Sequence, residues 1–121
     1  MIKQVKFVSI PTADQDLALE FWTERMGFKV ATDQPMGPDM RWIELAIPGA
    51  QTRIVLFTME GHEERIGTPF NGAFACDDVE YAYEKLVKRG VEFVEKPTKQ
   101  PWGVYAVFKD TDGNTFVLSS S

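Results

Sequence analysis

The chain has 121 residues, 44% of them hydrophobic, and a formal net charge of −5 at pH 7. This length can bury one core but leaves no room for a second full-sized domain, so we expect a single domain over residues 1–121. The acidic balance and the lack of a Lys/Arg run argue against nucleic acid as a partner. No apolar stretch approaches the ~20 residues that cross a membrane, so no membrane partner is expected.

Two features of the sequence favour a cytoplasmic location. Residues 1–5 lead directly into a strand-like pattern, without the apolar region of a signal peptide. Cys76 is the only cysteine, which excludes a disulfide within the chain and fits a reducing compartment.

The first half of the chain predicts a strand, a helix, a loop and a hairpin. The mainly apolar segment Phe7–Ile10 predicts a strand, whose alternate residues belong to two different faces. A helix is expected from Asp14, which can cap its first turn, to Met26, because apolar residues recur at helical spacing and Gly27 follows. The remaining segments are a Pro/Gly-rich loop at Thr32–Met40 and a hairpin of two strands, Arg41–Ile47 and Ile54–Thr58.

The second half repeats this pattern after a charged connector at Glu60–Pro69. Asn71–Asp78 corresponds to the first strand and cap, and the following helix is expected to begin at Asp77 and end at Gly90. A second hairpin is predicted at Val104–Lys109 and Thr115–Ser119, although both faces of its first strand are apolar. We therefore expect an α+β fold of two βαβββ modules, about residues 1–60 and 69–121, which form a curved mixed sheet around a cleft with the helices on the outer face.

Several motifs resemble those of a known family. They are the spacing of acidic, aromatic and glycine residues over Asp14–Phe28, the pair Arg41-Trp42, the segment Asp77–Val79 and the turn within Phe108–Phe116. Together they are similar to the vicinal oxygen chelate superfamily, which includes glyoxalase I, extradiol dioxygenases, and fosfomycin-resistance and bleomycin-binding proteins. The resemblance covers essentially the whole chain and implies the same paired-module fold, but this scaffold hosts many functions.

The resemblance also implies where a metal would be held, at four inward-facing strand positions. In this chain those positions correspond to Phe7, Leu56, Asn71 and Val117. Three of these side chains have no lone pairs, and an amide is a poor ligand for a divalent transition metal. We therefore expect no metal and no other cofactor.

Other candidate motifs have simpler structural explanations. His62 lies among charged connector residues, where a solvated surface is expected rather than a metal site. Asp110–Asn114 begins like a calcium loop but lacks the acidic residue that would complete it, so a hairpin turn is predicted. Cys76 has no histidine close in sequence and its alternation places it beneath a helix, as expected of a core residue rather than a nucleophile.

Glu44 is the candidate catalytic residue. In its strand, Ile43 and Leu45 belong to the helix-covered face, which sends Trp42 and Glu44 to the opposite, concave face. A carboxylate in an apolar cavity must find a donor or change its pKa, and both are common in binding sites. The alternative is an edge strand on which Glu44 simply reaches water.

Three classes of function remain open. The first is a metal-independent binder of an aromatic or amphipathic small molecule, held in an apolar cleft between the modules, as in the bleomycin-resistance branch. The second is a metal-free lyase- or isomerase-like enzyme, with Glu44 as general base and Arg41 or Asn71 stabilising an oxyanion. The third is a protein whose dimer surface is its function, and a homodimer is expected in any case. The predicted ligand-binding residues are Phe7, Ser9, Arg41, Trp42, Leu56, Thr58, Asn71, Trp102 and Val117.

Overall fold

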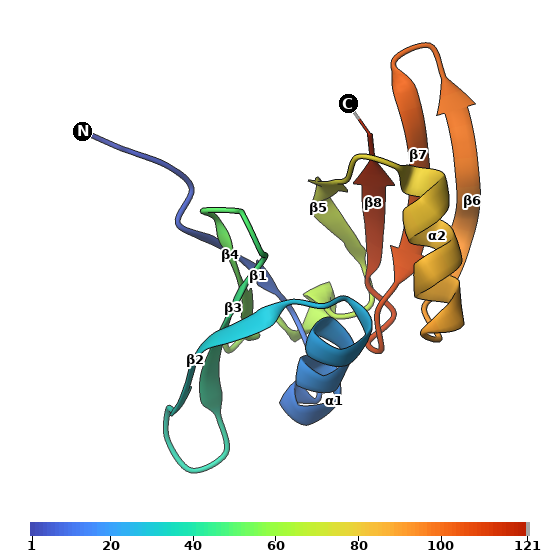
Figure 1. The fold of residues 1–121 in the computed structure, drawn as a ribbon. Helices are drawn as coiled ribbons and strands as arrows, with labels where there is room; N and C mark the ends of the chain where they lie inside the picture. Colours follow the sequence, from blue (N-terminus) through green and yellow to red (C-terminus); the bar gives the residue numbers. More distant parts are fainter. Residues whose placement is uncertain (121) are drawn as a thin grey trace. The chain divides into compact units, whose positions relative to one another are not determined.

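The structure is a computed structural model that describes residues 1–120. The chain divides into two compact units, Met1–Ile66 and Gly67–Ser121, and each contains one helical segment and one four-stranded mixed sheet (Figure 1). The predicted α+β fold of two βαβββ modules is therefore confirmed, with one separate sheet in each module.

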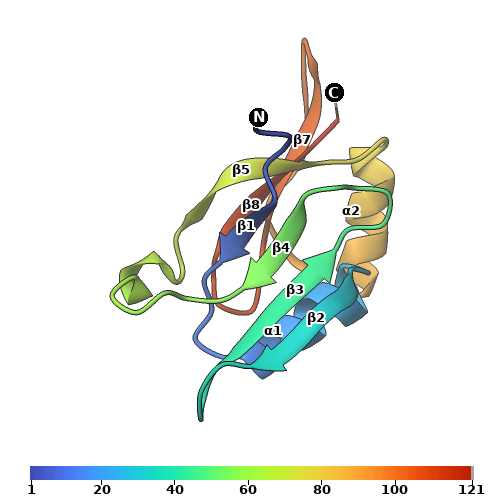
Figure 2. The same ribbon diagram turned by 90° about the vertical axis from the view of Figure 1, so that its left-hand side faces the viewer.

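The first module forms a sheet in the order β1-β4-β3-β2, with β1 parallel to β4 and the other neighbours antiparallel. Figure 2 shows these four strands side by side, with α1 behind them. The elements are β1 (Phe7–Ile10), α1 (Gln15–Glu20), the π-helical turn η1 (Phe21–Arg25), β2 (Lys29–Pro35), β3 (Arg41–Ala46), β4 (Arg53–Leu56) and the 3-10 turn η2 (Glu63–Arg65).

The start and end of the first helical segment follow the sequence signals. The Asp14 carboxylate accepts a hydrogen bond from the backbone N–H of Leu17 at 3.1 Å, which confirms the predicted cap. Gly27 has a φ of 83°, the left-handed conformation expected where a helix ends. The apolar residues of this segment do not all face the core, because Leu17 is 52% exposed whereas Ala18, Phe21 and Trp22 are buried.

Strand pairing gives this sheet two distinct faces. Leu45 pairs with Ile54 on the face covered by α1, and Ile10 pairs with Leu56 on that same face. These four side chains and Ile43 are at most 2% exposed, so they form the core of the module with Phe21 and Trp22. The opposite face, which no helix of this module covers, is called the open face below.

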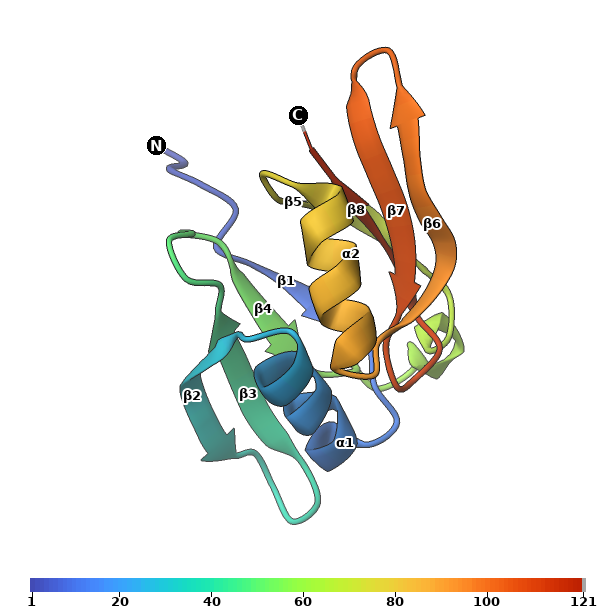
Figure 3. The same cartoon turned by 45° about the vertical axis from the view of Figure 1, so that its right-hand side comes forward.

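The second module repeats the arrangement, with the sheet order β5-β8-β7-β6. Helix α2 lies against one face of this sheet (Figure 3). The N-cap of α2 is Asp78, whose carboxylate accepts from the Tyr81 N–H at 3.0 Å, and not Asp77 as predicted. The elements are β5 (Pro69–Ala75), α2 (Val79–Lys88), β6 (Glu92–Gln100), β7 (Gly103–Lys109) and β8 (Thr115–Ser119).

Phenylalanine rings dominate the core of the second module. Phe108 lies 5.2 Å from Phe116 and 6.3 Å from Phe74, measured between ring centroids. The pairing of Phe108 with Phe116 places both on the helix-covered face, whereas Val107 pairs with Val117 on the opposite face. The orientation of this strand, which its sequence leaves open, is therefore set by its register with β8.

The turn between β7 and β8 is the predicted hairpin turn. The Asp110 carboxylate accepts hydrogen bonds from the backbone N–H groups of Asp112 and Asn114 and from the Asn114 side-chain amide, at 2.9–3.0 Å. Gly113 supplies the positive φ of 84° that the turn requires. Burial raises the pKa of Asp110 above its usual range, although the hydrogen bonds from Asn114 oppose this effect.

Candidate ligand-binding site

Three aromatic rings meet on the open face of the first module. The ring of Trp42 lies 5.4 Å from that of Phe7, edge to face, and 5.5 Å from that of Phe57. Register explains the meeting, because Ser9 and Glu44 both pair with Val55 in one row across the sheet. Phe7 and Trp42 each lie two residues from this row, on opposite sides of it, and Val55 within the row is fully buried.

Glu44 lies beside these rings and is held by two donors. Trp42 Nε1 donates to one carboxylate oxygen and an Arg53 guanidinium nitrogen donates to the other, each at 3.2 Å. The Glu44 side chain is 13% exposed, whereas that of Arg53 is 45% exposed. The predicted orientation of Trp42 and Glu44, opposite Ile43 and Leu45, is confirmed by the pairing. The carboxylate is oriented by a neighbour on each side.

A small pocket of about 110 Å³ lies next to Phe57 in the same module. The hydroxyl of Thr58 is already committed, because it accepts from the Thr12 N–H at 2.8 Å and donates to the Thr12 carbonyl at 3.0 Å. This pair joins the end of β1 to the end of β4 and fixes one wall. The lining residues are Ser9, Pro11, Phe57, Thr58, Met59, His62 and Arg65.

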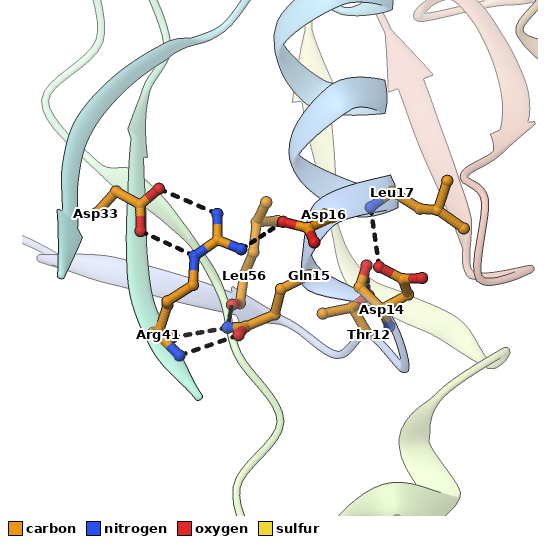
Figure 4. A network of polar contacts seen from close by, with 8 residues as sticks. All are labelled: Thr12, Asp14, Gln15, Asp16, Leu17, Asp33, Arg41 and Leu56. Atoms are coloured by element: carbon orange, nitrogen blue, oxygen red, sulfur yellow. Dashed lines mark hydrogen bonds and ion pairs between the residues drawn. The ribbon is translucent and has the colours of Figure 1, made fainter. Parts of the chain in front are cut away.

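Arg41, a predicted ligand-binding residue, lies on the helix-covered face instead of the open face. It lies two residues before Ile43 on β3, so both side chains belong to the same face of the sheet. On the neighbouring strand β2, Arg41 pairs with Pro35. Its guanidinium donates two hydrogen bonds to the Asp33 carboxylate, both at 3.1 Å, and a third to Asp16 on α1 (Figure 4). The hydrogen bonds to these two carboxylates raise the pKa of Arg41 further. Because Asp16 lies on α1 and Asp33 lies on β2, the guanidinium holds α1 against the edge of the sheet.

Leu56 also differs from its predicted position. It pairs with Ile10, is fully buried and lies under α1, so it does not line the open face. The resemblance placed Leu56 inward, and alternation gave no correction because Ile54, Val55 and Leu56 are all apolar and buried. Phe57 is the residue that sequence reasoning missed. Its only signal in the sequence is that it lies two residues after Val55 and therefore belongs to the same face.

The predicted residues of the second module are placed by its own sheet. Val117 pairs with Ala73 and Val107 on the face opposite that of Phe108 and Phe116. Asn71 is exposed on β5, where the pairing is irregular. Trp102 is 56% exposed in the β6–β7 turn and stacks on Tyr105 at 6.2 Å.

Two further features of the described residues bear on the class of site. Among residues 1–120, no group of three or more His, Cys, Asp or Glu side chains is placed to hold a metal ion. No helix in the same range is long and apolar enough to cross a membrane. Cys76 is half-buried, and burial raises the pKa of its thiol, which disfavours the thiolate that a nucleophile requires.

The fold and almost the whole length of the chain match one protein family. A sequence profile of the Glyoxalase/Bleomycin resistance protein/Dioxygenase superfamily matches residues 4–118, and the chain therefore belongs to this family. The resemblance inferred from the motifs is confirmed.

Individual relatives agree with this assignment. The Bacillus subtilis (strain 168) protein YetH is 43% identical over 121 residues, which cover 98% of each chain. A superfamily member from Sphaerobacter thermophilus DSM 20745 has a solved structure that is similar, with a TM-score of 0.88, 33% identity, and 99% of this chain and 98% of that chain covered. TnmS3, an antibiotic binding protein from Streptomyces sp. CB03234, has a TM-score of 0.86 and 35% identity, with 98% of this chain and 96% of TnmS3 covered.

Proposed function

We propose that this protein is a cytoplasmic, metal-independent binder of aromatic small molecules. The ligand contacts the open face of the first module. The observation that carries this proposal is the cluster of Phe7, Trp42 and Phe57 beside the oriented carboxylate of Glu44. Ligand sites in proteins typically combine an apolar, aromatic lining with a few positioned polar groups, and this face has both. The expectation that the ligand lies between the two modules stays a prediction.

The similarity to TnmS3 supports the class of ligand. TnmS3 is an antibiotic binding protein and shares 35% of its residues with this chain over almost the full length of both. A ring system stacked on Trp42 or Phe57 gains roughly 0.5–1.5 kcal/mol per aromatic pair beyond the burial of apolar area. An aromatic antibiotic or a metabolite of similar shape fits this surface.

The state of Glu44 favours binding over general-base catalysis. Both of its oxygens already accept a hydrogen bond, one from Trp42 and one from Arg53. Arg41, the proposed oxyanion donor of the alternative enzyme, is committed to Asp33 and Asp16 on the other face of the sheet. The metal-free enzyme therefore lacks one of its two proposed oxyanion donors, and Asn71 alone would have to serve.

The donor chemistry of the open face supports metal independence. On β1, on β4 and directly after β4, the side chains that face the same way as Glu44 include Phe7, Val55 and Phe57, which carry no lone pairs, and Ser9, which offers only a neutral hydroxyl. A divalent transition metal needs several nitrogen, oxygen or sulfur ligands at about 2.0–2.3 Å. One carboxylate that is already paired with Arg53 does not meet this requirement.

Ligand-induced stabilisation tests the proposal. We expect bleomycin or the neutral aromatic probe 2-naphthamide to raise the melting temperature, because a ligand at about 100 times its Kd stabilises the native state by ~2.7 kcal/mol. Trp42→Leu should remove the effect. Tyr81→Leu is the matched control, since Tyr81 is an aromatic residue that is 58% exposed on α2. No stabilisation by either probe, or equal stabilisation of wild type and Trp42→Leu, would contradict the proposal.

A further inference from the structure

The three rings of the open face are inclined to one another rather than stacked. The planes of Phe7 and Trp42 meet at 81°, and those of Trp42 and Phe57 meet at 52°. All three side chains are half-buried, so part of each remains accessible. The face of an aromatic ring carries a negative potential that attracts cations, most strongly for Trp. The cluster therefore attracts positive charge as well as apolar groups.

The carboxylate of Glu44 adds a full negative charge beside these rings. Its side chain is 13% exposed, so water and salt screen this charge less than they screen a charge on the open surface. Its neighbours across the sheet are Thr32 on β2 and Val55 on β4, and both are uncharged. In a chain with a net charge of −5, the wider electrostatic field also favours a positive ligand.

Arg53 shows which kind of group Glu44 accepts. One guanidinium nitrogen of Arg53 donates to Glu44 Oε1 at 3.2 Å, while the Arg53 side chain remains 45% exposed. An ion pair with such an exposed partner contributes little to stability, because water and salt compete for its charges. A ligand cation can therefore take the place of this guanidinium, and Arg53 then turns to solvent.

The carboxylate keeps its orientation during this exchange. Trp42 Nε1 donates at 3.2 Å to Glu44 Oε2, so it does not compete with a group that binds at Oε1. The two oxygens together have about four lone-pair sites, and Trp42 and Arg53 use one each. A bound cation therefore meets a positioned carboxylate oxygen directly beside the indole ring of Trp42.

We propose that the open face of the first module selects cationic ligands: a protonated amine, amidine or guanidine group carried by an aromatic ligand replaces Arg53 at Glu44. The cationic group donates to the Glu44 carboxylate beside the Trp42 ring, and the aromatic part of the ligand rests on Trp42 and Phe57. This inference depends on the proposed function and deepens it, because it names the class of ligand for the same face.

A matched pair of probes tests this preference: the cation 2-naphthylmethylammonium and its neutral analogue 2-naphthylmethanol. The two probes share one ring system and differ only in the group that meets Glu44. We expect wild type to bind the cation about tenfold more tightly, the size of effect that a hydrogen bond to a charged group gives. Calorimetric titration measures both affinities at physiological ionic strength, where exposed charges more than ~8 Å apart are largely screened.

Two variants of the ion pair should change the preference in opposite directions. Glu44→Gln should reduce the ratio of the two affinities to about one, because the carboxylate charge is lost. Arg53→Gln should raise the ratio above its wild-type value, because no guanidinium then competes for Glu44. The matched control is Glu84→Gln, which makes the same change in net charge as Glu44→Gln at an exposed position of α2 and should leave the ratio unchanged.

The outcomes separate this inference from the proposed function. If both probes bind wild type equally and Trp42→Leu weakens both, the cation preference is wrong and the aromatic face stands. If the preference survives in Glu44→Gln, falls in Arg53→Gln or is lost in Glu84→Gln, it does not arise from exchange at Glu44 and the inference is wrong. If Trp42→Leu binds both probes as wild type does, or if neither probe binds wild type, the aromatic face is wrong and the inference fails with it.

Discussion

The side-chain amide of Gln15 pairs with the backbone of Arg41 as a neighbouring strand would. Gln15 Oε1 accepts from the Arg41 N–H at 3.1 Å, and Gln15 Nε2 donates to the Arg41 carbonyl at 2.7 Å (Figure 4). The same Nε2 donates to the Leu56 carbonyl at 2.8 Å. The paired residues of β3 and β4 end before this point, so Gln15 satisfies backbone groups that the ladder leaves open.

Replacement of Gln15 by Ala should destabilise the protein by about 1–3 kcal/mol, the usual cost of unsatisfied buried polar groups. The midpoint of urea unfolding measures this loss. Gln51→Ala, at an exposed site, is the matched control and should leave the midpoint unchanged. A Gln15→Ala variant as stable as this control would mean that water replaces the amide without cost.

The stability contributed by Asp110 should fall as the pH rises. Burial raises the folded-state pKa of this carboxyl above its unfolded value of about 3.8, so between the two values the native state binds more protons than the unfolded state. Wild type should therefore lose stability relative to Asp110→Asn as the pH rises from about 3 through the raised pKa. Urea unfolding of both proteins at several pH values measures the difference. A difference that is constant, or that grows with pH, would contradict the raised pKa.

Glu44→Gln should weaken ligand binding by about tenfold or more, because it removes a charged acceptor while keeping the shape of the side chain. Folding stability should change by less than ~1 kcal/mol, since the partner Arg53 is largely exposed and such ion pairs contribute little. Arg53→Gln breaks the same ion pair from the other side and serves as the control. Unchanged probe affinity in Glu44→Gln would exclude an electrostatic role for this carboxylate.

The protein purified without a histidine tag should contain far less than one equivalent of zinc, nickel, iron or manganese by elemental analysis. A chelator should change neither its melting temperature nor its probe affinity, because the open face offers apolar side chains where several lone-pair donors are needed. A stoichiometric metal that survives dialysis would overturn this prediction and the metal-independent function together.

The protein should form a homodimer in solution. Apolar side chains remain exposed on its helices and edge strand, among them Leu17, Val30 and Tyr81, which are 49–58% exposed. Trp22 is fully buried within its own module and is not part of this exposed surface. Light scattering at micromolar concentration should give about twice the chain mass of 13.7 kDa. A species of 13.7 kDa alone would exclude the dimer.

Local signals in the sequence determined the modules and most element ends. Asp14 caps α1, and Gly27 and Gly90 adopt the positive φ that ends a helical segment, because caps and left-handed glycines depend on a few adjacent residues. The exception at the second helix is a shift of one residue, from Asp77 to Asp78, where two neighbouring carboxylates compete for the same role. Strand β2 runs to Pro35, into the predicted loop, because pairing with β3 satisfies its backbone.

The composition of the candidate site depended on tertiary structure. Alternation placed Trp42 and Glu44 correctly because the aliphatic residues Ile43 and Leu45 flank the charged Glu44, so the two faces of the strand differ in polarity. Leu56 was placed inward by the resemblance, and alternation gave no correction because every residue of Ile54–Leu56 is apolar; only the pairing with Ile10 identifies its face. The two acidic partners of Arg41 lie on α1 and β2, and only the folded chain brings them to its guanidinium. The small pocket beside Phe57 likewise joins Ser9 to His62 and Arg65, residues that are far apart in the sequence and become neighbours only when β1 pairs with β4.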